Sequence, residues 1–145
     1  GLGRVGTGAY DDLREQVGDV VVGVENDAVK IQPHEEAGRR VIQADVTDPA
    51  FWHRLERVNM DLILLAMPAH DSNMYAHEML RESQYKGKVA AVARFPDEVE
   101  ALEAAGVDVA FNMYAEAGAG FANHVRENMT PQRKTIVPGD PPTRS

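Results

Sequence analysis

The chain has 145 residues and a mass of 15.9 kDa, the size of a single domain with a continuous hydrophobic core. It carries 15 Lys and Arg against 23 Asp and Glu, and the net charge of −8 opposes binding to nucleic acid or to an anionic membrane surface. The absence of cysteine excludes disulfides, thiolate zinc sites and cysteine nucleophiles. The longest strongly apolar run, residues 62–67, is far shorter than the about 20 residues of a membrane-spanning helix. We therefore expect a soluble acidic domain.

Short β-branched runs alternate along the chain with longer amphipathic stretches, a pattern typical of βαβ units around a parallel sheet. In chain order the pattern predicts a helix over 5–17, a strand over 19–25, a helix over 27–37, a strand over 40–45, a helix over 49–57, a strand over 61–67, a helix over 72–85, a strand over 88–94, a helix over 96–105, a strand over 108–112 and a helix over 115–129. The strands are apolar at both odd and even positions, so we expect helices to cover both faces of the sheet.

Proline and glycine mark several of these boundaries. Pro49 and Pro96 lie near helix starts, with Asp48 as a candidate N-cap, and Gly38 and Gly106 follow helical turns as C-terminal stops. Pro33 is expected to interrupt the second helix if it lies beyond the first turn. Residues 1–129 thus form one domain, and the proline-rich residues 130–145 are expected to be an extended, disordered tail.

The first six residues, Gly1-Leu2-Gly3-Arg4-Val5-Gly6, form a G-x-G-x-x-G motif at the entrance to a helix. In such a loop the first glycine permits a tight turn, the second lets the backbone approach a phosphate, and the third lets the helix pack on a strand. The helix start adds free amides and a positive dipole end, which suit a phosphate or pyrophosphate.

An acidic residue follows the motif at the spacing that nucleotide binding requires. Glu25 ends the next predicted strand, 19 residues beyond Gly6, where a carboxylate can accept hydrogen bonds from both ribose hydroxyls. A carboxylate there repels a 2′-phosphate, so the sequence favours NAD(H) or a simple adenine nucleotide over NADP. The alternative is that the glycines serve only turns and that Glu25 is merely solvated.

The glycine motif also requires a preceding strand, which the sequence beginning at Gly1 does not include. In a doubly wound sheet that strand is central, and without it the neighbouring strands would keep unpaired buried backbone groups. We therefore expect the first strand of this Rossmann-like α/β sheet to lie upstream of Gly1.

Further marks, taken together, resemble a known family. They are Val-Glu-Asn-Asp at 24–27, Ala-Asp-Val-Thr-Asp at 44–48, Leu-Leu-Ala-Met-Pro at 64–68, Asn73, Ala-Arg at 93–94 and Ala-Gly-Val at 105–107. With the glycine loop and its Arg4, they resemble the RCK or KTN (TrkA-N) nucleotide-binding domain of potassium transport systems. Within this family the chain is most similar to the cytosolic domain of Kef-type glutathione-regulated potassium efflux proteins. The resemblance runs from Gly1 to about Met129, although Ala44 and Val46 replace the smaller Gly and Ala that are common in the family.

The resemblance implies a set of ligand contacts. It places phosphates on Gly3, Arg4, Val5 and Gly6, the ribose on Glu25 with Asn26 beside it, adenine near Asp45 and Val46, and Ala66 and Met67 as the floor of the site. The general location agrees with the rule that open α/β sheets bind ligands outside the carboxyl ends of their strands. Arg4 could instead be a solvated surface side chain.

The resemblance also implies a function. A non-enzymatic domain that binds NAD(H), AMP or ATP would control a potassium efflux or potassium/proton antiport system through ligand-dependent conformational bias. Its partner would be a membrane transporter in the same or an associated chain, at the cytosolic face of the inner membrane. Alternatives are the cofactor-binding fragment of an NAD-dependent dehydrogenase and an NAD sensor unrelated to ion transport.

No other pattern in the sequence points to a metal site or to catalytic residues. No histidine pair has the spacing and neighbouring Glu of a zinc helix, and no tyrosine is followed four residues later by Lys. We therefore expect neither a metal site nor a catalytic base.

The final helix contains Gly118 and Gly120, which cost about 1 kcal/mol each relative to alanine. Close approach of another backbone would offset this cost, so we expect a homodimer through Tyr114, Ala117 and Phe121, the alternative being packing on the domain's own sheet.

Overall fold

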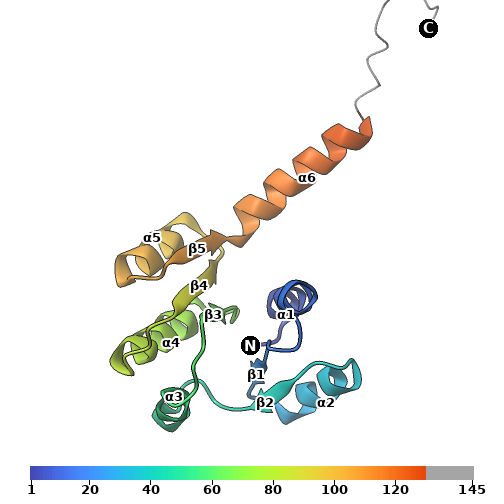
Figure 1. The fold of residues 1–145 in the computed structure, drawn as a ribbon. Coiled ribbons are helices and arrows are strands. Elements are labelled where there is room, and N and C mark those ends of the chain that lie inside the picture. The colour runs from blue at the N-terminus through green and yellow to red at the C-terminus, as the bar shows by residue number, and fades with distance from the viewer. Residues whose placement is uncertain (130–145) are drawn as a thin grey trace, which may run out of the picture.

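The computed structural model describes residues 1–129 and shows five short parallel strands alternating with six helices (Figure 1). In chain order they are α1 (Arg4–Val17), β1 (Gly23–Glu25), α2 (Ala28–Glu36), β2 (Val41–Gln43), α3 (Pro49–Leu55), β3 (Leu62–Leu65), α4 (His70–Glu82), β4 (Lys88–Ala93), α5 (Pro96–Ala105), β5 (Val109–Asn112) and α6 (Met113–Met129). Each predicted element is present, with ends that move by one to a few residues. The predicted tail over 130–145 lies outside the described residues.

The helix ends use the signals that the sequence contains. The Asp48 side chain accepts a hydrogen bond from the amide of Ala50 at 3.0 Å, with Pro49 as the first residue of α3. Gly106 ends α5 with a φ of 100°, in the left-handed region that glycine adopts without strain.

The expectation for Pro33 was wrong. Pro33 lies beyond the first turn of α2, yet the helix continues through it to Glu36. A proline removes one amide donor from the helical ladder. No residue of α2 is buried, so water can reach the carbonyl that loses this bond.

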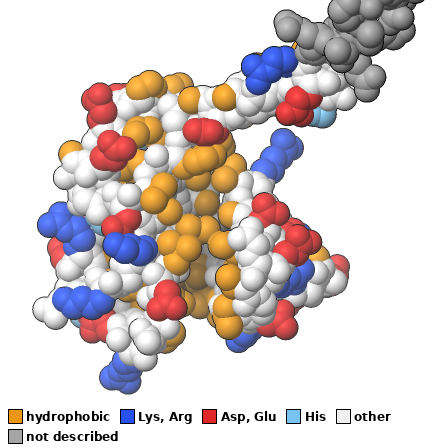
Figure 2. Space-filling model, turned by 45° about the horizontal axis from the view of Figure 1, so that its top comes forward, with side chains coloured by type: hydrophobic (Ala, Val, Ile, Leu, Met, Phe, Trp, Pro, Cys, Tyr) orange, Lys and Arg blue, Asp and Glu red, His pale blue; other side chains and the backbone are white. Residues whose placement is uncertain are grey.

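Within residues 1–129 the strands pair in two groups. β1 pairs with β2, with Gly23 opposite Val41, while β3, β4 and β5 form the second sheet with β4 in the middle. Figure 2 shows hydrophobic side chains gathered along a hollow in the surface of the molecule. The expectation of a strand upstream of Gly1 is not tested by these residues and stays a prediction.

The main core lies between the three-stranded sheet and helices α3, α4 and α5. It is built from aliphatic side chains of β3, β4, α4 and α5, closed at one side by the edge-to-face pair Phe51 and Trp52. The buried members are Phe51, Trp52, Leu65, Ala76, Leu80, Val89, Ala91, Ala93, Leu102 and Val107. This core fixes where β3 and β4 end, and so fixes one wall of the candidate site.

Helices do not cover both faces of every strand, contrary to our expectation. Leu62 and Leu64 of β3 are 46% and 38% exposed, and Val109 and Phe111 of β5 are 57% and 45% exposed. α4 and α5 pack on this sheet, and the exposed side chains are alternate residues that share the opposite face of their strands. Apolar residues at both odd and even strand positions therefore did not indicate that both faces of the sheet are buried.

Helix α6 extends away from the rest of the molecule (Figure 1). None of its residues is buried, and Phe121 and Met129 are 72% and 75% exposed. Packing of this helix on the domain's own sheet, the alternative considered from the sequence, is therefore not what the structure shows.

Candidate functional site

The glycine loop leads directly into α1 and leaves the first amides of that helix without helical partners. The first amide with such a partner is that of Thr7, which donates to the carbonyl oxygen of Gly3 at 2.9 Å. The amides of Arg4, Val5 and Gly6 precede it, and Gly3, the N-cap residue, supplies no side-chain cap. A helix start of this kind attracts an anion.

The three glycines of the loop have different surroundings. A Cβ on Gly6 would collide with the carbonyl oxygen of Gly1 and would lie 3.6 Å from Cβ of Ala66, so Gly6 permits close packing of the helix start. A Cβ on Gly1 would lie 3.3 Å from Cγ of Met67. A Cβ on Gly3 would meet no atom within 4 Å, so the middle glycine faces open space. This is the arrangement that close approach of a phosphate to the backbone requires.

Glu25 lies beside the glycine loop and is held there by three backbone amides. One carboxylate oxygen accepts from the amide of Leu2 at 3.2 Å, and the other accepts from Asn26 at 3.1 Å and Asp27 at 3.2 Å. Burial raises the Glu25 pKa, but the hydrogen bonds from the amides of Asp27 and Leu2, together with nearby positive charge that includes Lys30, leave this pKa below its ordinary value. Glu25 is therefore an ionised acceptor at the edge of the loop.

The residues expected to surround a base lie on the neighbouring strand. Asp45 and Val46 follow β2, which pairs with β1, so they share the carboxyl edge with Glu25. Asp45 is exposed and accepts hydrogen bonds from the Thr47 amide at 2.8 Å and hydroxyl at 2.6 Å, which lower the Asp45 pKa. The carbonyl of Val46 accepts from the indole of Trp52 at 2.8 Å, which anchors this segment to the core.

The remaining predicted residues lie around the same loop. Ala66 and Met67 follow β3 and contact the positions of Gly6 and Gly1. Asn26 follows β1, and its carbonyl accepts from the side chain of Gln43 at 3.4 Å. Arg4 is exposed at the start of α1 and forms no hydrogen bond or ion pair with another side chain within residues 1–129. The structure thus gathers the predicted residues at the carboxyl edge of the strands.

Two contributors to the site, Thr7 and Asn73, were not assigned a role from the sequence. The Thr7 hydroxyl donates to the carbonyl of Leu2 at 3.1 Å, and the buried Leu2 side chain packs on Gly23, which holds the loop against β1. Asn73 binds both backbone groups of Met67. Asn73 was noted in the sequence only as a mark of the family resemblance, whereas Thr7 carried no distinctive pattern.

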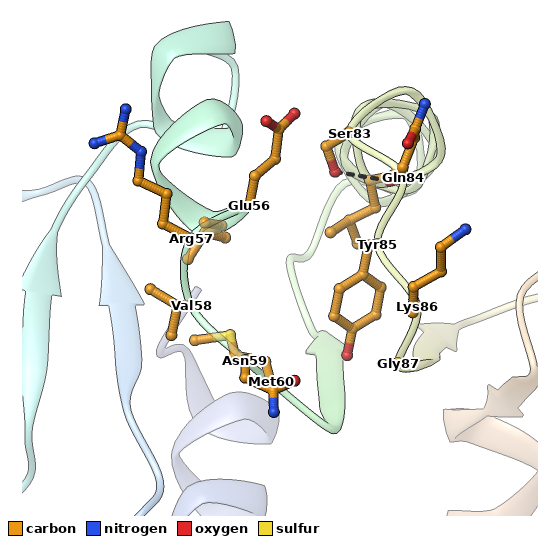
Figure 3. A pocket seen from close by; sticks show the side chains of 12 residues that line it. Glu56, Arg57, Val58, Asn59, Met60, Ser83, Gln84, Tyr85, Lys86 and Gly87 are labelled. Carbon is orange, nitrogen blue, oxygen red and sulfur yellow. Dashed lines mark hydrogen bonds between the residues drawn. The ribbon is translucent and has the colours of Figure 1, made fainter.

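A cavity of about 240 Å³ lies at the other end of the strands (Figure 3). Residues 55–60 and 83–87, which precede β3 and β4, line it together with Leu80. It includes none of the predicted ligand residues and is not the candidate site.

Within residues 1–129 there is no group of three or more His, Cys, Asp or Glu side chains placed to hold a metal ion. No helix among these residues combines the length and hydrophobicity needed to cross a membrane.

A comparison with models of known sequence families identifies the family of this chain. A sequence model described as the TrkA-N domain matches residues 1–113. The chain belongs to the TrkA-N family. The family resemblance inferred from the motifs is confirmed, while the narrower similarity to Kef-type proteins is not shown. A comparison with curated proteins gives no match.

Solved structures share the fold of this TrkA-N domain. The NAD(P)-binding domain of an exopolyphosphatase-related protein from Archaeoglobus fulgidus matches with a TM-score of 0.77 and 20% identity, over 88% of this chain and 94% of that one. The TrkA-N domain of the inner membrane protein YbaL from Escherichia coli matches with a TM-score of 0.73 and 18% identity, over 86% and 92%. GsuK bound to ADP matches with a TM-score of 0.67 and 19% identity, over 77% of this chain and 29% of GsuK, and the GsuK channel has also been solved bound to NAD. The predicted Rossmann-like α/β fold is confirmed.

Proposed function

We propose that this TrkA-N domain binds an adenine nucleotide, NAD(H) or AMP or ATP, at the glycine loop and performs no chemistry on it. The observation that carries the proposal is the open space at Gly3, in front of the unpartnered amides of α1, with the Glu25 carboxylate fixed at its edge. A phosphate fits the amides and a ribose diol fits the carboxylate.

Different residues would contact different parts of the ligand. The amides of Arg4, Val5 and Gly6 would hold the phosphate, with the Arg4 guanidinium adding a charge-assisted contact. Glu25 would accept from the ribose, with Asn26 beside it. Asp45 and Val46 would border the base, and Ala66 and Met67 would form the floor.

The ionised state of Glu25 supports a preference for NAD over NADP. The hydrogen bonds from Leu2 and Asp27 favour the charged carboxylate, so the negative charge is present at neutral pH. A ribose 2′-phosphate would meet like charge at close range, which disfavours binding.

We infer that ligand binding regulates a potassium efflux or potassium/proton antiport system. The family membership supports this, as do the ADP-bound and NAD-bound structures of the GsuK channel. A ligand that prefers one arrangement of a homodimer would bias an attached or associated membrane transporter, with the domain at the cytosolic face of the inner membrane.

Calorimetric titration of the chain with NAD, NADP, AMP and ATP tests the ligand proposal. We expect binding of NAD or an adenylate, with NADP at least about tenfold weaker than NAD because of the charge on Glu25. Glu25→Arg should remove this preference by replacing repulsion with attraction.

Glu35→Arg is the matched control, because Glu35 is exposed on α2 and forms no side-chain hydrogen bond within residues 1–129. This variant makes the same charge change and should keep the wild-type preference. Equal affinity of the wild type for NAD and NADP would contradict the role of Glu25, and no binding of any of these compounds would refute the proposed function.

A further inference from the structure

Asn73 is a buried polar side chain in the first turn of α4, on the side of the helix that faces the core. Only 1% of its surface is exposed, and its neighbours in the core, Ala76 and Leu80, are apolar. A buried amide that lacked partners would be strongly destabilising, so the hydrogen bonds of this side chain account for its presence.

Those hydrogen bonds all go to the carboxyl ends of β3 and β4. The Asn73 Oδ1 accepts from the amide of Met67 at 3.1 Å, and Nδ2 donates to the carbonyl of Met67 at 2.9 Å. Nδ2 also lies 3.5 Å from the carbonyl of Val92 in β4. The side chain therefore pairs with both backbone groups of Met67, as a neighbouring strand would, at a place where β3 has ended.

Met67 is the point at which the core meets the candidate site. Its Cγ lies 3.3 Å, and its Cα 3.8 Å, from the position that a Cβ on Gly1 would take. No polar side chain other than Asn73 hydrogen bonds to the backbone of Met67 within residues 1–129. The position of this residue beside the glycine loop thus depends on an amide buried one layer below.

We propose that Asn73 is a positioning residue that fixes Met67 as the floor under the nucleoside part of the ligand. This inference rests on the proposed function. The phosphate would be held by the amides of α1, none of which Asn73 contacts, so Asn73 should affect the nucleoside and the phosphate unequally. Loss of the side-chain pairing frees the Met67 peptide and removes the fixed surface on which the nucleoside lies.

The test compares ADP with inorganic pyrophosphate by calorimetry on the whole chain. Asn73→Leu keeps the branched shape of the side chain, although its two methyl groups are bulkier than the amide, and removes all three hydrogen bonds. Asn73→Asp keeps an acceptor toward the Met67 amide and serves as a second variant if the leucine variant does not fold. In either variant that folds, we expect ADP affinity to fall at least about tenfold and pyrophosphate affinity to stay within about twofold of the wild type.

Leu80→Ala is the matched control for lost stability. Leu80 is on the same helix and only 2% exposed, but its hydrocarbon side chain cannot hydrogen bond to Met67. This variant should lower the melting temperature and leave the ratio of ADP to pyrophosphate affinity unchanged. An unchanged ratio in the Asn73 variants would overturn the positioning role while leaving the proposed function intact. A wild-type chain that binds neither compound would overturn both.

Discussion

At the scale of single residues, the glycines of the loop and of α1 perform separate tasks although they share one residue type. Gly6 has no room for a side chain, because the carbonyl of Gly1 occupies the place of a Cβ. Gly3 and Gly8 both have open space around the Cβ position, but Gly3 faces the candidate phosphate site and Gly8 is exposed within α1. Substitutions at these positions can therefore separate the contribution of the glycines to ligand binding from their contribution to folding stability.

Gly3→Ala should weaken ligand binding without unfolding the protein. The added methyl group meets no protein atom, so the free energy of unfolding should change by less than about 0.5 kcal/mol. The same methyl group occupies the space that a phosphate would take, so nucleotide affinity should fall by about tenfold or more. Urea denaturation and calorimetry measure the two effects.

Gly6→Ala and Gly8→Ala provide the comparison. Gly6→Ala should lower the free energy of unfolding by about 1–3 kcal/mol through overpacking. Gly8→Ala should raise it by about 0.5–1 kcal/mol, because alanine is the better helix former, and should leave affinity unchanged. Normal affinity in Gly3→Ala would show that the loop does not hold the phosphate.

At the scale of elements, α1 is tied to the chain around β2 by polar contacts. The amide of Arg40 donates to the hydroxyl of the buried Tyr10 at 2.7 Å. Arg39 forms a two-point ion pair with Asp11, with both distances 2.8 Å, and its guanidinium holds the Asp11 pKa below the ordinary value. Arg14 donates to the carbonyl of Gly38 at 2.8 Å. These bonds anchor the helix that carries the glycine loop.

Tyr10→Phe should lower the free energy of unfolding by about 1 kcal/mol, because it leaves the Arg40 amide without its acceptor. The measurement is urea denaturation followed by circular dichroism. Tyr75→Phe is the control, since the Tyr75 hydroxyl donates to the carbonyl of Thr47 at an exposed site and its loss should cost less than about 0.5 kcal/mol. Equal losses in the two variants would show that the Tyr10 contact does not anchor α1.

At the scale of the whole molecule, α6 has little support from the rest of the domain, since none of its residues is buried. Tyr114, Phe121 and Val125 are 54%, 72% and 40% exposed, and they recur at intervals of seven and four residues along one side of the helix. A Cβ on Gly118 or Gly120 would meet no atom within 4 Å, so the close approach expected at these glycines is absent within the described residues of this chain. A second copy packing on this helix would account for both features.

Sedimentation velocity at micromolar concentration should therefore show a dimer. Phe121→Asp should shift the chain toward monomer, because it places a charge in the centre of the apolar side of α6. Val20→Asp is the control, since Val20 is 76% exposed between α1 and β1 and lies outside this helix. A wild-type chain that sediments only as a monomer would contradict the predicted homodimer.

Much of the fold followed from local pattern in the sequence. The alternation of apolar runs and amphipathic stretches predicted every helix and strand, and Asp48 and Gly106 marked helix ends correctly, because caps and periodicity act over a few neighbouring residues. The glycine motif and Glu25 predicted the core of the candidate site because their spacing reflects one strand-turn-helix unit. Burial on both sheet faces and the effect of Pro33 were mispredicted, since both depend on what packs against the element.

By itself, the sequence determined the order of the elements, the glycine loop and the acidic residue that faces it, since each depends on residues close together in the chain. Only the tertiary structure decided that α6 stands clear of the domain and that Asn73 holds Met67 beside Gly1. These features join residues distant in sequence, and their arrangement depends on which hydrogen bonds and apolar contacts can be satisfied together in space.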